Sequence, residues 1–234
     1  MKKITKVATV LAGIAATTAL AGTAQAAEGK ADGKFQFKVL ATAVLPDGAV
    51  KSVKVDPLGL TNAAITNTSA NDNVTPTVSI EYFVTPKISV ETIAGITAHH
   101  VNVSSGALKG VEAVSDVKII PATLTAKYHL QLPYGIKPYV GAGPALYLVI
   151  SDEPSAAVKG LGLGVTRTKL TSELGVAAQA GVDVALGHGF GLALDAKKYW
   201  VGTNATFYAG NTVALVTRHK LDPWVLSAGV SYRF

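Results

Sequence analysis

Ionisable side chains recur inside runs of otherwise apolar residues, and they define the chemistry open to this chain. The residues that stand out in this way are Lys38, Glu81, Glu91, Lys127, Asp183, Asp195 and Arg233. Each occupies a polar position in a segment where apolar and polar residues alternate. Because a charge removed from water needs a partner of opposite sign, this mixture of signs predicts a buried network of ion pairs.

Nucleophilic catalysis has one candidate in the sequence. His99 and His100 stand close to Ser104 and Ser105. A serine–histidine pair with an orienting carboxylate could serve an enzyme that modifies membrane lipids. No third group stands out beside them. A lipid-modifying enzyme is therefore kept as an alternative, and we predict no catalytic residues.

Metal and nucleotide sites have no signature here. His99 and His100 are neighbours, and neighbouring residues of a strand point to opposite faces, so the two cannot bind one ion unless the strand ends there. The sequence has no H-E-x-x-H spacing, no G-x-S-x-G motif and no phosphate-binding loop. We predict no metal ligands and no cofactor.

The segments that position the charged residues repeat with a period of two. Apolar and polar residues alternate over 34–46, 74–83, 88–100, 120–130, 137–150, 173–186, 192–199 and 224–234. This pattern is typical of β-strands with one apolar and one polar face. The connections at 85–86, 132–136 and 187–189 are short, whereas those at 46–72, 102–116, 151–169 and 202–221 are long.

Short and long connections that alternate along the chain fall at opposite ends of the strands. This arrangement predicts an all-β fold, an eight-stranded antiparallel transmembrane β-barrel, with short turns in the periplasm and long loops outside. A sheet can span a bilayer only when it closes on itself, because lipid solvates no backbone polar group. The last strand must then pair with the first, and Phe234 can lie in a belt of aromatic residues at the periplasmic interface.

Aromatic residues near the strand ends support two such belts. Those near the short turns are Phe35, Phe37, Tyr82, Phe83, Tyr128, Phe190, Tyr232 and Phe234. Those near the long connections are Tyr147, Trp200 and Trp224. Aromatic side chains gather at both interfaces of membrane barrels.

Composition agrees with an exported membrane protein. Residues 1–26 have the basic start, the apolar stretch and the small residues before a cleavage site that mark a signal peptide, so we expect 27–234 to form the barrel. Loss of the three signal lysines lowers the formal net charge from +6 to about +3, which gives no electrostatic case for nucleic-acid binding. The chain is 49% hydrophobic and 15% charged and has no cysteine. After the signal, no uncharged apolar run is long enough for a transmembrane helix.

Several quoted stretches resemble the OmpW family of small outer-membrane proteins. They are FQFKVLATAVLPDG, GLTN, SIEYFVTPKISVETIAG, IKPYVGAGPALY, QAGVDVAL, DAKKYW and LDPWVLSAGVSYRF. The resemblance covers nearly all of the chain after the signal. It implies an outer-membrane barrel of a Gram-negative bacterium, with a narrow, largely hydrophobic lumen proposed to pass small apolar molecules. The terminal Phe234 looks like the signature by which barrel-assembly machinery recognises its substrates.

The polar faces of the strands allow the lumen to be divided by depth. Near the short turns lie the seven charged residues named first, which we expect to form a charged floor. Toward the long connections the inward positions become apolar or small, and they include Leu40, Val44, Ile93 and Val201 as an apolar mouth. Lys197 projects inward at middle depth, where we expect it to pair with Asp195 or Glu173, and attraction of an anionic group on an amphiphile is the alternative. An eight-stranded barrel has room only for side chains or one small ligand.

Three prolines lie within predicted strands. Pro76, Pro121 and Pro144 each remove a backbone donor from the ladder of hydrogen bonds. A weakened ladder could form a lateral opening through which an apolar solute reaches the bilayer. A bulge or strand edge with no traffic is the alternative.

The function predicted from sequence is a small outer-membrane channel for uptake of small apolar molecules. Its partners would be outer-membrane lipids, a small hydrophobic solute and the barrel-assembly machinery, with no nucleic acid. A structural or adhesive barrel with a plugged interior remains the alternative, because the same charged network could serve either role.

Overall fold

The computed structural model describes residues 33–57, 59–162 and 164–234, and the predicted signal peptide, residues 1–26, lies outside this part of the chain. The strands are β1 (Phe35–Leu45), β2 (Ala49–Val55), β3 (Asn67–Ala70), β4 (Asn73–Phe83), β5 (Ile88–Gly95), β6 (Thr97–Ser105), β7 (Glu112–His129), β8 (Ile136–Pro154), β9 (Val165–Leu170), β10 (Glu173–Gly187), β11 (Phe190–Trp200), β12 (Gly202–Ala209), β13 (Thr212–Lys220) and β14 (Trp224–Arg233). The helical segments are α2 (Leu60–Ala63), η1 (Pro133–Gly135) and α3 (Ala156–Gly160). Within these ranges, no helix is both long and apolar enough to cross a membrane.

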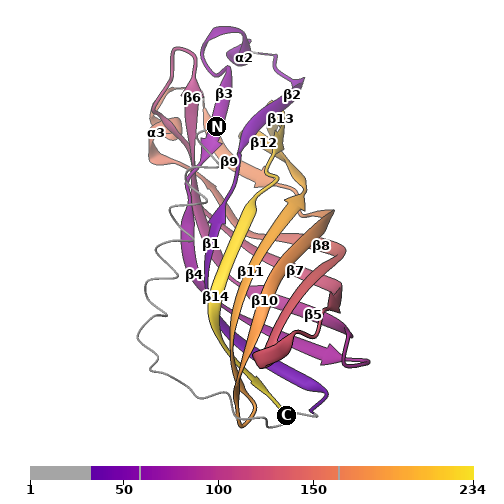
Figure 1. Ribbon diagram of the computed structural model, residues 1–234. Helices are drawn as coiled ribbons and strands as arrows, with labels where there is room; N and C mark the ends of the chain where they lie inside the picture. The colour runs from indigo at the N-terminus through magenta and orange to yellow at the C-terminus, as the bar shows by residue number, and fades with distance from the viewer. Residues whose placement is uncertain (1–32, 58, 163) are drawn as a thin grey trace.

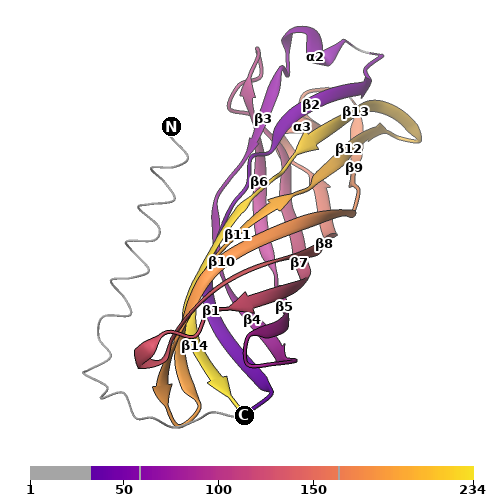
Figure 2. The same ribbon diagram turned by 45° about the vertical axis from the view of Figure 1, so that its right-hand side comes forward.

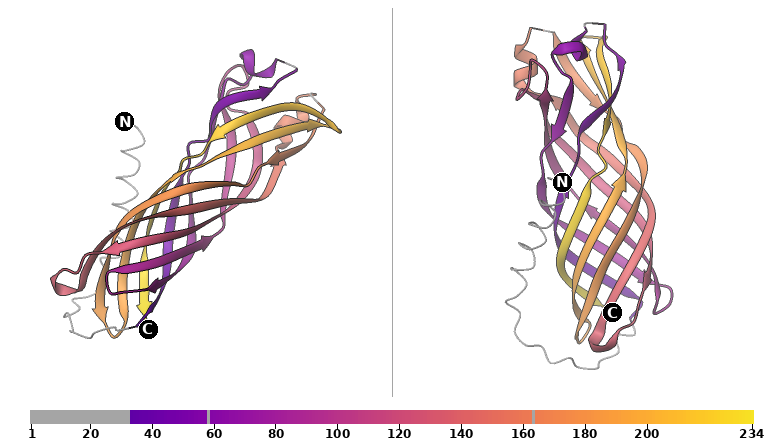
Figure 3. Two further views of the ribbon diagram at one scale, coloured as in Figure 1. Left: turned by 90° about the vertical axis from the view of Figure 1, so that its right-hand side faces the viewer. Right: turned by 45° about the horizontal axis from the view of Figure 1, so that its top comes forward.

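Antiparallel pairing closes the larger sheet into a barrel (Figures 1 and 3). The ladders run from β1 through β4, β5, β7, β8, β10, β11 and β14, and then return to β1. The closing ladder joins β1 to β14, from Gln36 opposite Arg233 to Leu45 opposite Trp224. The prediction of a closed antiparallel transmembrane-type barrel is confirmed.

The predicted number of strands was wrong. In the described part of the chain the larger sheet has ten strands, not eight, because β6 and β3 extend it from β7 beside the closed ring of eight strands. The segment predicted as one strand over 88–100 is divided at Ile96 into β5 and β6, and both halves pair with β7. In addition, β3 pairs with β6, although its residues were predicted to be loop.

A second sheet lies above the barrel, in the order β2-β13-β12-β9 (Figures 1 and 2). It is built from segments that were predicted as long loops, so that part of the interpretation was also wrong. The connection over 202–221 is the hairpin of β12 and β13, whose ladder runs from Gly202 opposite Lys220 to Ala209 opposite Thr212. Strands β7 and β8 also extend beyond the predicted ranges.

Alternation of side chains gives the barrel an apolar outer face and a filled interior. Val39 and Ile80 are about half exposed on the outside, whereas their neighbours Lys38 and Glu81 are 1% and 0% exposed. An exposed apolar belt of this kind is stable where lipid covers it. Phe83 and Tyr147 depart from the predicted aromatic belts, because both side chains are buried in the interior.

Phe234 is joined to the first strand by backbone and ring contacts. Its amide donates to the Phe35 carbonyl at 2.8 Å, and the Phe35 amide donates to the Phe234 carbonyl at 3.1 Å. The Phe234 ring stacks on those of Phe35 and Tyr232 at centroid distances of 6.1 Å and 6.0 Å.

Replacement of Phe234 by alanine should lower the amount of inserted barrel. The ring is 62% exposed, so most of its contribution would come from aromatic contacts and from lipid at the interface, on the order of 1–2 kcal/mol. The fraction of protein that resists unfolding in unheated SDS gels measures insertion. Val230→Ala, at an exposed position of the same strand, is the control, and equal yields for both variants would contradict a special role for the ring.

Candidate functional site

Buried ion pairs fill one end of the barrel, at the level of the short turns. Lys38 Nζ lies 2.9 Å from Glu81 Oε2, 3.2 Å from Glu91 Oε2 and 3.1 Å from Asp183 Oδ1. Lys127 Nζ lies 2.9 Å from Glu81 Oε2 and 3.0 Å from Glu91 Oε2. These side chains are almost completely removed from solvent. The predicted charged floor therefore has the paired geometry that its burial requires.

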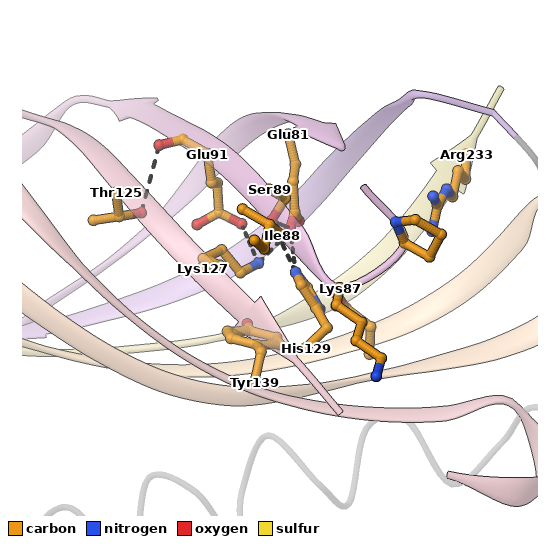
Figure 4. A network of polar contacts seen from close by, with 12 residues as sticks. Glu81, Lys87, Ile88, Ser89, Glu91, Thr125, Lys127, His129, Tyr139 and Arg233 are labelled. Atoms are coloured by element: carbon orange, nitrogen blue, oxygen red, sulfur yellow. Dashed lines mark hydrogen bonds and ion pairs between the residues drawn. The ribbon is translucent and has the colours of Figure 1, made fainter. Parts of the chain in front are cut away.

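Strand register explains why the lysines converge on these carboxylates. Glu81 of β4 and Glu91 of β5 are direct cross-strand partners, which is an unfavourable placement for two like charges. Lys38 reaches both carboxylates from β1 on one side, and Lys127 reaches both from β7 on the other. Each lysine therefore relieves the repulsion between the two glutamates, and Figure 4 shows Lys127 beside both of them.

Lys197 extends the network toward the middle of the barrel. Its Nζ lies 2.6 Å from Asp195 Oδ1 and 3.0 Å from Glu91 Oε1. Asp195 also accepts a hydrogen bond from the Tyr139 hydroxyl at 2.8 Å. Of the two partners suggested by sequence, Asp195 is thus the one in contact, whereas Glu173 forms its ion pair with Arg218.

Arg233 lies at the rim of the floor. Its Nε donates to the Gly33 carbonyl at 2.7 Å, and its guanidinium carbon lies 3.6 Å from the centroid of the Phe83 ring. Arg233 and Asp183 both line a small hollow at this end of the barrel. Arg233 therefore faces the opening at this end of the barrel, while the other six predicted floor residues lie inside.

His129 contacts Ser89 and Glu81 on the side of the charged floor nearest the short turns. Its Nε2 lies 2.8 Å from Ser89 Oγ and 2.9 Å from Glu81 Oε1 (Figure 4). A catalytic triad would place the carboxylate on the opposite ring nitrogen, Nδ1, but in the described residues that atom has no hydrogen-bond partner. All three side chains are fully buried, so a substrate could not reach the serine.

Glu81, His129 and Asp183 also place three ligand atoms within 4.8 Å of one another. Lys38 Nζ already contacts both carboxylates of this group. A metal ion would have to displace a buried lysine from its partners. The arrangement is therefore better explained as an ion-pair network than as a metal centre.

The other serine–histidine candidate does not assemble. His100 Nδ1 lies 2.5 Å from Glu112 Oε1, and the Ser105 hydroxyl bonds to Thr66. His99 Nδ1 donates to the Asn71 carbonyl. In the described chain, neither histidine is hydrogen-bonded to Ser104 or Ser105.

An apolar cavity lies at the other end, between the barrel and the second sheet. Its enclosed part has a volume of about 70 Å³, and its mouth opens to solvent. Barrel residues such as Val117, Ile119 and Tyr147 form one wall, and Ala205 and Leu215 of the second sheet lie on the other. A mostly apolar concave site with few polar groups is typical of small-molecule binding.

The four residues predicted as an apolar mouth are divided by depth. Val44 lines the cavity, and Val201 packs in the same buried cluster. Leu40 and Ile93 form a separate cluster with Ala193. Along β1, Leu40 lies between Val44 and Lys38, so this second cluster separates the cavity from the charged floor.

His219 is a polar wall residue from the second sheet. Its Nδ1 lies 3.1 Å from Thr68 Oγ1 and 3.4 Å from the Gly48 carbonyl, and its Nε2 lies 2.7 Å from Thr217 Oγ1. Burial lowers the pKa of His219, and the hydrogen bond to Gly48 only partly opposes this. The ring is therefore neutral at neutral pH, as an apolar surrounding requires.

Each of the three prolines borders an interval without strand pairing in the described ladders. The β4–β5 ladder ends at Thr77, next to Pro76. Pro121 lies where β7 pairs with neither β5 nor β6, between Ile119 and Thr123. The β7–β8 ladder skips Gly143 and Pro144. The Pro121 side chain is buried, whereas Pro76 and Pro144 are exposed.

The chain matches one known protein family over residues 31–234. The matching model is that of the OmpW family. The chain belongs to the OmpW family. Its homologues are outer-membrane proteins of Gram-negative bacteria, and the protein is therefore an outer-membrane β-barrel of such a bacterium.

Relatives in the OmpW family and its structural neighbours support this placement. An uncharacterised outer-membrane protein, y4mB, of Sinorhizobium fredii is 30% identical over 90% of this chain and 85% of its own. Outer membrane protein AlkL of Ectopseudomonas oleovorans is 28% identical, covering 71% of this chain and 68% of its own. The crystal structure of OprG from Pseudomonas aeruginosa superposes with a TM-score of 0.74 at 23% identity, over 86% of this chain and 96% of that one, and so agrees in fold.

Several residues of the charged floor and the apolar cavity of this OmpW-family protein were not among the predicted site residues. His129 and Tyr139 complete the charged floor, and Thr203, Ala205 and His219 complete the cavity. The first two lie on the inward face of predicted strands, so their position was available from the alternation. The other three belong to the second sheet, whose strands were predicted as loop.

Proposed function

We propose that this protein takes up small apolar molecules through the cavity above its charged floor. The observation that carries the proposal is an apolar cavity at one end of a membrane barrel, which the cluster of Leu40, Ile93 and Ala193 separates from a layer of buried ion pairs. An apolar solute gains favourable contacts in the cavity. It would lose them at the floor, where the charged side chains of three lysines and four carboxylates already satisfy one another: Lys38, Lys127, Lys197, Glu81, Glu91, Asp183 and Asp195.

The route that follows from this arrangement leads sideways into the bilayer. The intervals around Pro121 and Pro144 lie in the neighbouring strands β7 and β8, and the interval around Pro76 lies in β4, on the other side of β5. Pro121 stands directly opposite Tyr147, which lines the cavity. A strand segment without ladder hydrogen bonds separates from its neighbour at lower cost than a paired one. The unpaired intervals support a lateral exit at this position.

Replacement of the prolines one at a time by alanine tests the exit. Alanine supplies the missing N–H group and permits pairing, so Pro121→Ala is expected to slow uptake severalfold. Uptake is measured as the fluorescence that 1-N-phenylnaphthylamine gains when added to intact cells, whose lipopolysaccharide excludes the dye. Pro86→Ala in the β4–β5 turn is the control. If none of the three strand variants slows uptake, the lateral route loses its support.

A structural barrel with a plugged interior is the second candidate function. The dense packing of the charged floor favours this candidate, because a layer of buried ion pairs would close the lumen. A plugged barrel would leave dye uptake unchanged when the protein is produced. A rise in uptake that depends on the cavity would exclude this candidate.

A further inference from the structure

The cavity wall carries few polar side chains, and they are not equivalent. They are Thr61, Thr68, His99, Tyr147, Thr171, Thr203, Thr217 and His219. A polar group on an apolar wall is costly unless it is hydrogen-bonded. A polar wall group that has no hydrogen-bond partner in the protein therefore points to a ligand.

The threonine hydroxyls already have partners in the protein. Thr61 bonds to Asp56, Thr68 to the Gly48 carbonyl, Thr171 to Glu173, and Thr203 to the Thr171 carbonyl. Thr217 bonds to His219, and both ring nitrogens of that histidine are therefore engaged. The Tyr147 hydroxyl has no partner among the described residues, but the oxygen is enclosed by its neighbours.

His99 differs from all of these. Its ring is 4% exposed and lines the cavity, and its Nδ1 lies 2.8 Å from the Asn71 carbonyl. A carbonyl oxygen can only accept, so Nδ1 carries the proton and the neutral ring presents Nε2 as an acceptor. In the described residues nothing donates to this Nε2, and the atom is absent from the fully enclosed polar groups.

We propose that His99 Nε2 accepts a hydrogen bond from the hydroxyl group of a ligand in the cavity. The preferred ligand class is then an apolar molecule that carries one hydroxyl, rather than a plain hydrocarbon. Asn71 fixes the ring for this task, because its carbonyl sets the tautomer. This inference rests on the proposed function of the cavity and specifies its ligand.

Two molecules of nearly equal shape, naphthalene and 2-naphthol, test the inference. Binding of each to the full protein in lipid nanodiscs is followed by its own fluorescence, with empty nanodiscs as the reference. We expect the protein to bind 2-naphthol about three- to tenfold more tightly than naphthalene, which is the range for one net hydrogen bond.

Variants of His99 should remove only this preference. His99→Phe is expected to bind both probes with equal affinity while its naphthalene affinity stays unchanged. His99→Gln, which returns an acceptor, should restore part of the preference. His100→Phe, at the exposed neighbour, should bind as the unmodified protein does. Resistance to unfolding in unheated SDS gels establishes that each variant is folded.

The outcomes separate this inference from the proposed function. Equal binding of the two probes by the unmodified protein would overturn the role of His99 and leave the apolar cavity in place. Tighter binding of 2-naphthoate than of 2-naphthol would also overturn it, because the ring would then be a charged donor. Binding of neither probe above empty nanodiscs would refute both proposals.

Discussion

Lys38→Met is expected to cost about 3–5 kcal/mol of unfolding free energy, the largest effect of any single substitution considered for this barrel. Lys38 is 1% exposed and contacts Glu81, Glu91 and Asp183. Methionine has a similar shape but no charge, so these carboxylates would lose a shared cation inside a barrel that admits little water. Urea unfolding of the protein in lipid vesicles, followed by tryptophan fluorescence, measures the change.

Lys220→Met is the matched control. Lys220 also forms an ion pair, with Asp222 at 3.3 Å, but its side chain is 52% exposed. An exposed pair of this kind contributes about 0.2–1 kcal/mol. If the two methionine variants lost equal stability, the view that burial gives the floor its importance would be wrong.

A double variant identifies the source of the loss. Glu91 stands directly opposite Glu81, and both depend on Lys38. Removal of the Glu91 charge should therefore recover part of the stability lost in Lys38→Met, so that Lys38→Met/Glu91→Gln is more stable than Lys38→Met alone. Contacting residues couple in this non-additive way, and simple addition of the two single effects would contradict the network.

Ala205→Trp is expected to reduce uptake of 1-N-phenylnaphthylamine by about tenfold or more, because the indole would occupy an already narrow apolar space. Ala205 is 2% exposed and lines the cavity from β12. The second sheet lies above the barrel, so the barrel ladders are not altered. Dye uptake by cells that contain equal amounts of each variant provides the measurement.

Ala209→Trp controls for the size of the new side chain. Ala209 lies at the end of the same strand and is not part of the cavity wall. This variant should take up the dye at the unmodified rate. Equal losses in both variants, or none in Ala205→Trp, would show that solute does not pass through this cavity.

The charged floor could be predicted because its signal is local. Lys38, Glu81 and Lys127 are each flanked by apolar residues, and a period of two leaves them only the interior face. The partners of each charge could not be read in the same way. They depend on strand register, which places Glu81 opposite Glu91 and leaves Glu173 with Arg218.

The second sheet could not be predicted because its signal is not local. β13 pairs with β2, so His219 lies opposite Val50 although the two residues are far apart in the sequence. Both strands are also short. Two shifts of register in this ladder further obscure the alternation. The division at Ile96 escaped prediction for a related reason, since the apolar pattern continues across it while the pairing changes from β5 to β6.

The ladder between β1 and β14 has a consequence for biogenesis. The two strands come from opposite ends of the described chain, so their meeting has a large entropic cost and is expected to be a late step of folding. Until then both strand edges remain open and can recruit other chains. We therefore expect the nascent polypeptide to need shielding of these edges during transit, and stalled intermediates to be the main targets of proteolysis.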